Sequence, residues 1–142
     1  MKRLIFILSL VFLASCSKNY ISVYDKAIYS DYLASVKMGT PDERNLESFL
    51  GERLIVSWDI PKELFSSSDH WELIHKIRFG NREEIESRYV LDRHKGSFKY
   101  DLLDEEYYEK KGISTYKVEL YNEDGLKEIW KHQVWVDYIK IE

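Results

Sequence analysis

The sequence is poor in the residues that cross-link a chain or break its regular structure. It has one cysteine, Cys16, in 142 residues, which excludes an intramolecular disulfide and a zinc site built from several thiolates. It has only two prolines and six glycines, and it contains no low-complexity run and no internal repeat. A domain formed by this chain must therefore be stabilised by packing alone.

Clusters of Lys and Arg are also missing. The chain has 21 basic and 25 acidic side chains, a formal net charge of −4, and the two signs are interspersed along it. Proteins that bind nucleic acids need a basic footprint. The sequence therefore predicts no nucleic-acid partner.

Motifs of catalytic and metal sites are absent from the sequence. Neither HExxH nor GxSxG occurs, and the glycines are not spaced as in a phosphate-binding loop. His70 and His75 lie five residues apart, so on a strand they point to opposite faces and cannot ligate one ion together. His75 lies among apolar residues and is expected in or near the core. We predict that the protein is not an enzyme and that it has no cofactor and no metal site.

No apolar run reaches the roughly 20 residues of a membrane-spanning helix. The longest covers residues 4–13, which are apolar except for Ser9. Lys2 and Arg3 precede it, and the small residues Ala14 and Ser15 follow. A basic start, a short apolar stretch and small residues at the end predict a secretory signal peptide over residues 1–15.

The end of this segment, Leu13-Ala14-Ser15-Cys16, resembles the lipobox of bacterial lipoproteins. The resemblance implies that Cys16 is acylated and becomes the mature N-terminus, so that the membrane is a partner through the acyl chains. Two or more such chains give stable anchoring. Ser17, in place of an aspartate, implies an exported protein anchored in the cell envelope at the outer membrane. Removal of residues 1–15 leaves 19 basic and 25 acidic side chains, a formal charge of −6.

We predict that residues 16–39 form the lipidated N-terminus and a tether. Tyr24, Ile28 and Tyr32 recur at a spacing of four, which permits a short amphipathic helix in this segment. A partly ordered tether is the alternative to the helix.

The predicted domain covers residues 40–142. Thr40, Pro41 and Glu43 suit the start of a helix. Residues 41–50 therefore form either a single helix or the first strand of the domain.

Beyond residue 53 apolar and polar residues alternate, as in half-buried strands. In the final segment, 126–142, the apolar set changes face between Trp130 and Trp135, which predicts a bulge or a strand covered on both faces. Short strands without a long helix predict an all-β fold, an antiparallel β-sandwich of about seven strands. The alternating segments are 53–60, 70–79, 84–93, 97–103, 113–121 and 126–142.

Two of these segments resemble strands of fibronectin type III and other immunoglobulin-like domains. LIVSW before Pro61 is similar to the B strand, and YKVEL before Asn122 is similar to the F strand. The resemblance implies that Trp58, Tyr116 and Val118 are core residues. It also implies that the Tyr116 hydroxyl bonds to backbone in the bend at residues 103–112.

A second resemblance involves GISTYKVELYNEDG and WKHQVWV. These stretches resemble uncharacterised chlamydial lipoproteins, and this likeness implies no activity.

Exposed aromatic residues are the best candidates for partner contacts, because tyrosine gives contact area at low entropic cost. Tyr107 and Tyr108 lie in an acidic bend, and Trp135 is the third candidate. Of Trp130 and Trp135, which point oppositely on a regular strand, at most one is a core residue.

These features predict a lipid-anchored envelope lipoprotein that acts as a protein-binding or scaffold module. The alternative is a carbohydrate- or peptidoglycan-binding module, in which exposed Trp and Tyr rings stack on a glycan. An envelope hydrolase, using the serines at 66–68 with Asp69 and His70, is a distant third.

Overall fold

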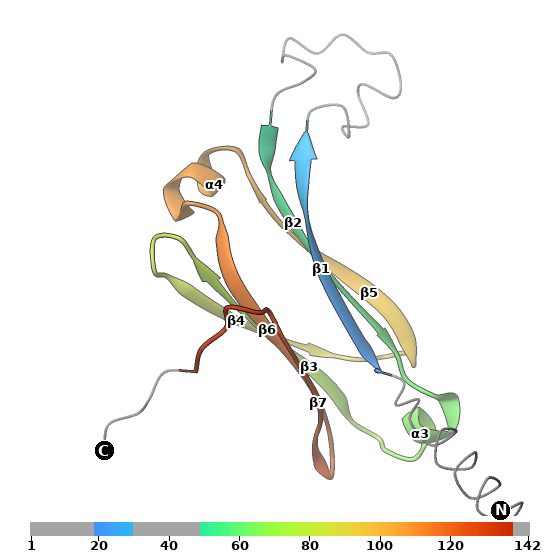
Figure 1. The fold of residues 1–142 in the computed structure, drawn as a ribbon. Coiled ribbons are helices and arrows are strands. Elements are labelled where there is room, and N and C mark those ends of the chain that lie inside the picture. The colour runs from blue at the N-terminus through green and yellow to red at the C-terminus, as the bar shows by residue number, and fades with distance from the viewer. Residues whose placement is uncertain (1–18, 30–48, 138–142) are drawn as a thin grey trace, which may run out of the picture.

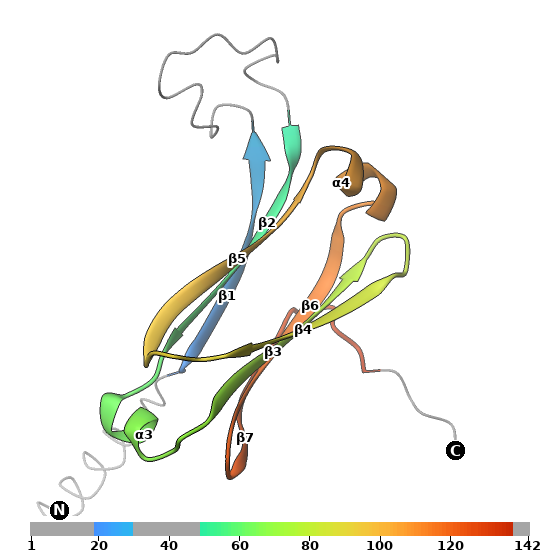
Figure 2. The same ribbon diagram turned by 180° about the vertical axis from the view of Figure 1, so that it is seen from behind.

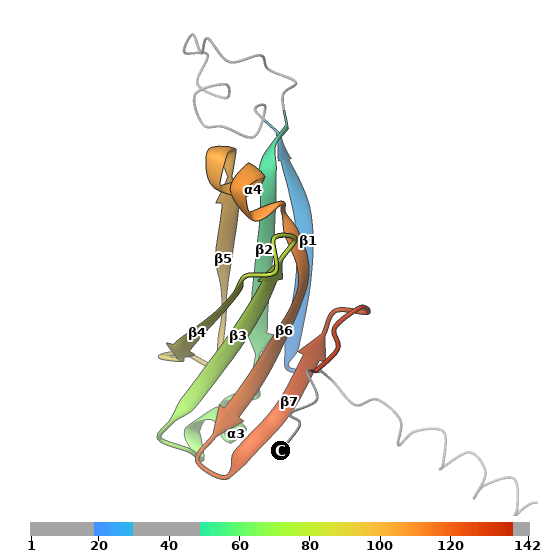
Figure 3. The ribbon, with the colours of Figure 1, turned by 90° about the vertical axis from the view of Figure 1, so that its left-hand side faces the viewer.

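Two antiparallel sheets packed face to face make up the part of the chain that the computed structural model describes, residues 19–29 and 49–137 (Figure 1). The strand orders are β1-β2-β5 and β4-β3-β6-β7. Figure 3 shows the two layers from the side, and the predicted antiparallel β-sandwich is confirmed. The elements are β1 (Ile21–Tyr29), β2 (Phe49–Asp59), α3 (Lys62–Ser66), β3 (Trp71–Phe79), β4 (Glu84–Val90), β5 (Lys95–Leu103), α4 (Asp104–Lys110), β6 (Ile113–Asn122) and β7 (Gly125–Lys131).

The strand order is that of an immunoglobulin-like sandwich. β2 pairs with β1 on one side and with β5 on the other, whereas β4 pairs with β3 in the second sheet. β4 therefore has the place of the extra strand that variable-type immunoglobulin domains add to their C-F-G sheet. The chain passes from one sheet to the other between β4 and β5 (Figure 2).

The core lies between the sheets and is built from the alternating apolar residues. Successive residues of a strand point to opposite faces, so each alternating segment contributes one apolar face. Trp58, Tyr116 and Val118, which were predicted as core residues, all belong to the buried cluster. The side chains at its centre are Leu54, Val56, Ile60, Trp71, Leu73, Ile77, Leu102, Val118 and Leu120.

The sandwich begins at β1, inside the segment predicted to be a tether. Ile21 and Val23 of β1 are buried, and the strand pairs with β2 along its length. The spacing of Tyr24 and Ile28 is therefore not that of a helix, and Tyr24 is 52% exposed. The tether prediction is wrong for Ile21–Tyr29, because pairing with a distant strand outweighs a weak local pattern.

Several sequence predictions concern residues outside the described part. The signal peptide, Cys16, the rest of the predicted tether and most of residues 41–50 fall there, although β2 already begins at Phe49. Within residues 19–29 and 49–137, no helix is both long and apolar enough to cross a membrane.

The two ends of the sandwich carry different short helices (Figure 1). α3 lies at the end where β1 begins, and we call this the α3 end. There the Trp71 indole nitrogen donates to the Phe65 carbonyl at 3.0 Å, and the two rings stack. α4 lies at the opposite end, where β1 stops at Tyr29, and we call this the α4 end.

Candidate functional site

Four aromatic side chains form a continuous cluster at the α4 end. Tyr29 contacts Phe49 edge to face with ring centroids 5.8 Å apart, and Phe49 contacts Tyr107 in the same way at 5.0 Å. Tyr107 then contacts Tyr108 at 5.5 Å. Tyr108 is 68% exposed and Tyr29 is 43% exposed, so the cluster reaches solvent at both ends. We call these four residues the α4 aromatic cluster.

α4 holds this cluster in place because the helix is fixed to the turn between β3 and β4. The Gly80 and Asn81 amides donate to the carbonyls of Gly112 and Lys110, each at 3.0 Å. The helix ends at Lys110; its C-cap, Lys111, has a left-handed conformation, and Gly112 follows with φ +75°. Glycine suits that conformation. The two tyrosines therefore stand on a positioned element.

Carboxylates surround the exposed end of the cluster. Asp104, Glu105 and Glu109 of α4 are exposed, whereas Glu106 accepts a hydrogen bond from Lys110 at 2.7 Å. α4 thus carries four acidic side chains and one basic side chain. The segment predicted as a bend is a short helix whose outer surface is aromatic and acidic.

The prediction of Trp135 as a partner contact is wrong. The side chain is only 8% exposed, because the chain after β7 folds back over the outer face of the four-stranded sheet. The Arg78 guanidinium lies 3.9 Å from the ring centroid, and the indole nitrogen donates to Asp137 at 2.9 Å. Hydrogen bonds from Lys131 and Trp135 hold the pKa of Asp137 well below its usual range.

Trp130 occupies the other side of this sheet. Its ring lies parallel to that of Tyr116 with centroids 5.2 Å apart, and it packs against the core half-buried. β7 ends at Lys131, so Trp130 lies in a strand and Trp135 does not. Strand alternation therefore does not extend to Trp135, and no continuous strand runs through residues 126–137.

Tyr116 is buried, but its hydrogen bond differs from the one that the resemblance implies. The hydroxyl donates to the Asp25 carboxylate of β1 at 2.7 Å and not to backbone in residues 103–112. Tyr116 belongs to the core cluster between the sheets, and Asp25 lies on β1, an edge strand of the three-stranded sheet. Burial and this hydrogen bond raise the pKa of Tyr116. The bond links β1, an edge strand of one sheet, to β6, an inner strand of the other.

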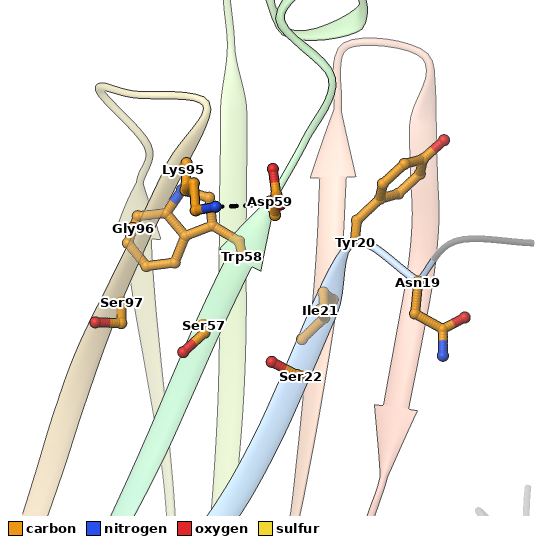
Figure 4. A pocket seen from close by; sticks show the side chains of 10 residues that line it. All are labelled: Asn19, Tyr20, Ile21, Ser22, Ser57, Trp58, Asp59, Lys95, Gly96 and Ser97. Atoms are coloured by element: carbon orange, nitrogen blue, oxygen red, sulfur yellow. Dashed lines mark hydrogen bonds and ion pairs between the residues drawn. The ribbon is translucent and has the colours of Figure 1, made fainter.

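A second candidate site is an open pocket of about 450 Å³ at the α3 end (Figure 4). A row of serines from three strands, Ser22, Ser57 and Ser97, forms part of its wall. Lys95 and Asp59 flank the row and form an ion pair at 3.4 Å. The pocket offers hydroxyl groups and one cation, but its Lys95 and Asp59 side chains neutralise each other.

Trp58 borders this pocket, but its ring is turned toward the sheet. The indole lies against Gly96, where an added Cβ would come within 2.5 Å of the ring. Its nitrogen donates to the Arg93 carbonyl at 3.0 Å. The pocket therefore has no exposed tryptophan face on which a sugar ring could stack.

His75 is the most unusual polar residue of the core. It is 1% exposed, and neither ring nitrogen has a hydrogen-bond partner. Its neighbours are the aromatic rings of Tyr89, Phe98 and Tyr100, at centroid distances of 5.5, 5.1 and 6.2 Å. Burial lowers the pKa of His75 to about 4.

These sites offer contact surface and hydrogen bonding. Over the described ranges, no group of three His, Cys, Asp or Glu side chains lies close enough to hold a metal ion. Sequence reasoning had identified Tyr107 and Tyr108 but missed Tyr29 and Phe49, which only the pairing of β1 with β2 brings to them. No protein-family model, no curated protein and no solved structure matches the chain significantly.

Proposed function

We propose that the protein is a lipid-anchored lipoprotein of the cell envelope that binds another protein through the α4 aromatic cluster. It is a binding or scaffold module and not an enzyme. The observation that carries this proposal is the run of four touching aromatic rings that ends in Tyr108, 68% exposed on a positioned helix.

Protein interfaces are enriched in tyrosine, because the ring gives a large contact area with few rotatable bonds. The cluster is also held in place before binding, which lowers the entropic cost of association. The carboxylates of α4 favour a partner with basic residues around an apolar centre, since complementary charge speeds and orients association.

Truncation of Tyr108 tests this surface. We expect Tyr108→Ala to weaken the partner complex by about 30-fold, the effect of losing an aromatic hot spot. The measurement is in-cell crosslinking of the native lipoprotein to identify the partner, followed by titration of the purified pair. Tyr24→Ala is the matched control, because Tyr24 is 52% exposed on a different surface. If Tyr108→Ala kept its affinity for the partner while Tyr24→Ala lost affinity, the α4 aromatic cluster would not be the binding surface.

The lipid anchor rests on the sequence of residues 13–16. We expect Cys16→Ser to abolish acyl labelling and to move the protein from the membrane fraction to the soluble fraction, because each buried CH₂ contributes about 0.8 kcal/mol of membrane affinity. Labelling with a radioactive or clickable fatty acid, followed by fractionation, measures both effects. A Cys16→Ser protein that keeps its label is incompatible with the anchor, and Ser17→Ala serves as the neighbouring control.

A glycan-binding module is the second candidate, and the pocket at the α3 end is the observation in its favour. Its serine hydroxyls and the Lys95–Asp59 pair suit hydroxyl-rich ligands. Its tryptophan is covered, however, and this weakens the stacking that sugar binding needs. Protein binding therefore remains the primary proposal.

A further inference from the structure

The outer face of the β1-β2-β5 sheet, near the α3 end, has a chemical character of its own. We call it the three-stranded face, and it consists of four rows of side chains across the strands. We propose that this face lies on the bilayer that holds the lipid anchor and that anionic lipid headgroups are its occupant. This inference rests on the anchor proposed above. The rows are Tyr20, Asp59 and Lys95; Ser22, Ser57 and Ser97; Tyr24, Ile55 and Lys99; and Lys26, Arg53 and Asp101.

The chain between the anchor and this face is short. Asn19 lines the pocket on the face, and it follows Cys16 by three residues. Three residues span at most about 10 Å. β1 starts at Ile21 and is an edge strand of this sheet. The acyl chains on Cys16 would therefore hold this edge of the sheet close to the headgroups.

The three-stranded face is basic, although the mature chain has a formal charge of −6. It carries four cations and two carboxylates. Asp59 pairs with Lys95, and Asp101 pairs with Arg53. Counted over the described residues of the three strands, the face has a formal charge of +2. The cations are Lys26, Arg53, Lys95 and Lys99, and the carboxylates are Asp59 and Asp101.

The outer face of the other sheet is electrically balanced. Its cations and carboxylates are equal in number, and ion pairs link them into a network. This surface has no charge preference for an anionic membrane. Its cations are Lys76, Arg78, Arg88, Lys117 and Lys131, and its carboxylates are Glu72, Glu84, Glu86, Glu119 and Asp137.

The uncharged residues of the three-stranded face also suit a headgroup region. Tyr24 is 52% exposed, and tyrosine is enriched at membrane–water interfaces. Ser22 and Ser97 are small and exposed, so headgroups can approach the strands and the pocket beside Lys95 (Figure 4). The face therefore combines an interfacial aromatic ring, hydroxyl groups and positive charge.

The expected preference is sufficient for an anchored protein. Each basic residue close to an anionic membrane surface favours contact by about fivefold. Two positive charges in excess would therefore favour the orientation in which this face lies against the membrane by roughly 30-fold. Such a factor would bind a free protein only weakly, but the anchor already holds the domain at the membrane and leaves only its orientation to be fixed.

The test uses the acylated full-length protein in vesicles of phosphatidylethanolamine and phosphatidylglycerol. Because Cys16 carries the lipid, a fluorophore on Ser97→Cys labels the three-stranded face alone. Ile129→Cys labels the opposite outer face, where the side chain is 41% exposed. With a quencher on the lipid headgroups, we expect several-fold stronger quenching at position 97 than at position 129.

Two matched charge variants complete the test. Lys95→Gln with Lys99→Gln removes the excess charge and is expected to abolish the difference in quenching. Arg88→Gln with Lys131→Gln removes the same charge from the opposite face and is expected to preserve it. The thermal unfolding midpoint of each variant verifies its fold.

Three results would overturn the inference. Equal quenching at both positions in protein that floats with the vesicles would refute the orientation while leaving the anchor intact. A difference that persists in Lys95→Gln with Lys99→Gln would refute anionic headgroups as the occupant. Protein that does not float with the vesicles would overturn the anchor itself, and the orientation with it.

Discussion

Replacing Trp58 with alanine is expected to lower the free energy of unfolding by about 3–5 kcal/mol, the usual cost of truncating a buried tryptophan. The ring belongs to the core cluster and is 9% exposed. Its loss would leave a cavity against Gly96 and would remove the hydrogen bond from the indole nitrogen to the Arg93 carbonyl. Urea unfolding followed by far-ultraviolet circular dichroism measures the change.

Two further substitutions separate the causes of this effect. Trp58→Phe keeps most of the apolar contact but loses the hydrogen bond, so its cost should be smaller by at least half. Tyr24→Ala removes a ring that is 52% exposed and should change stability by less than about 1 kcal/mol. A Trp58→Ala protein as stable as the parent would mean that the ring does not fill the core.

The strands of the sandwich could be predicted from the sequence because most of them bury one face. Trp71, Leu73 and Ile77 share one face of β3, and all three are buried, whereas three of the four positions on the other face hold Glu72, Lys76 and Arg78. The same pattern located β2, β5 and β6 to within a few residues. Burial of one face imposes the period of two, so the period is visible wherever the other face meets water.

β1 was not predicted as a strand, because its alternation of apolar and polar residues is short and is interrupted by a polar residue. The position that should continue the buried face after Ile21 and Val23 holds Asp25, whose carboxylate accepts the hydrogen bond from Tyr116. Asp25 itself is exposed, so the alternation of buried and exposed residues stops there and the sequence resembles a polar tether. Its partner lies 91 residues away, and only the folded arrangement explains it.

The candidate contact surface was predictable only in part. An acidic segment rich in tyrosine pointed to Tyr107 and Tyr108, but the other half of the cluster comes from the far ends of β1 and β2. Trp135 was misplaced because a tryptophan outside a strand can fold back onto cations, here Arg78 and Lys117. A local sequence pattern does not show that a segment after the last strand will fold back and pack against the sheet.

Acid is expected to destabilise the protein through His75. The pKa of about 4 in the folded state lies below the value of about 6.5 for an exposed histidine, so protons bind more tightly to the unfolded chain. The stability that the neutral ring contributes is fully present above pH 6.5 and is lost as the pH falls toward 4. The two pKa values correspond to about 3 kcal/mol in total, of which about 2 kcal/mol is lost at pH 5.

The variant His75→Phe isolates this contribution from the protonation of carboxylates. Phenylalanine suits the aromatic surroundings of Tyr89, Phe98 and Tyr100, and it removes two buried nitrogens that lack partners. The difference in unfolding free energy between His75→Phe and the parent should therefore grow by about 2 kcal/mol from pH 7.5 to pH 5. His70→Gln, at an exposed position, should show no such growth.

Burial raises the pKa of Tyr100, whose ring contacts His75, so Tyr100 stays neutral over this pH range and the growth with acid would report on the imidazole itself. Denaturant unfolding of the three proteins at a series of pH values gives the curves. Parallel curves for parent and His75→Phe would mean that the ring meets water or a hydrogen-bond partner in solution. The aromatic enclosure between β3, β4 and β5 would then be open, and the packing of the two sheets along that edge would be looser than the buried ring requires.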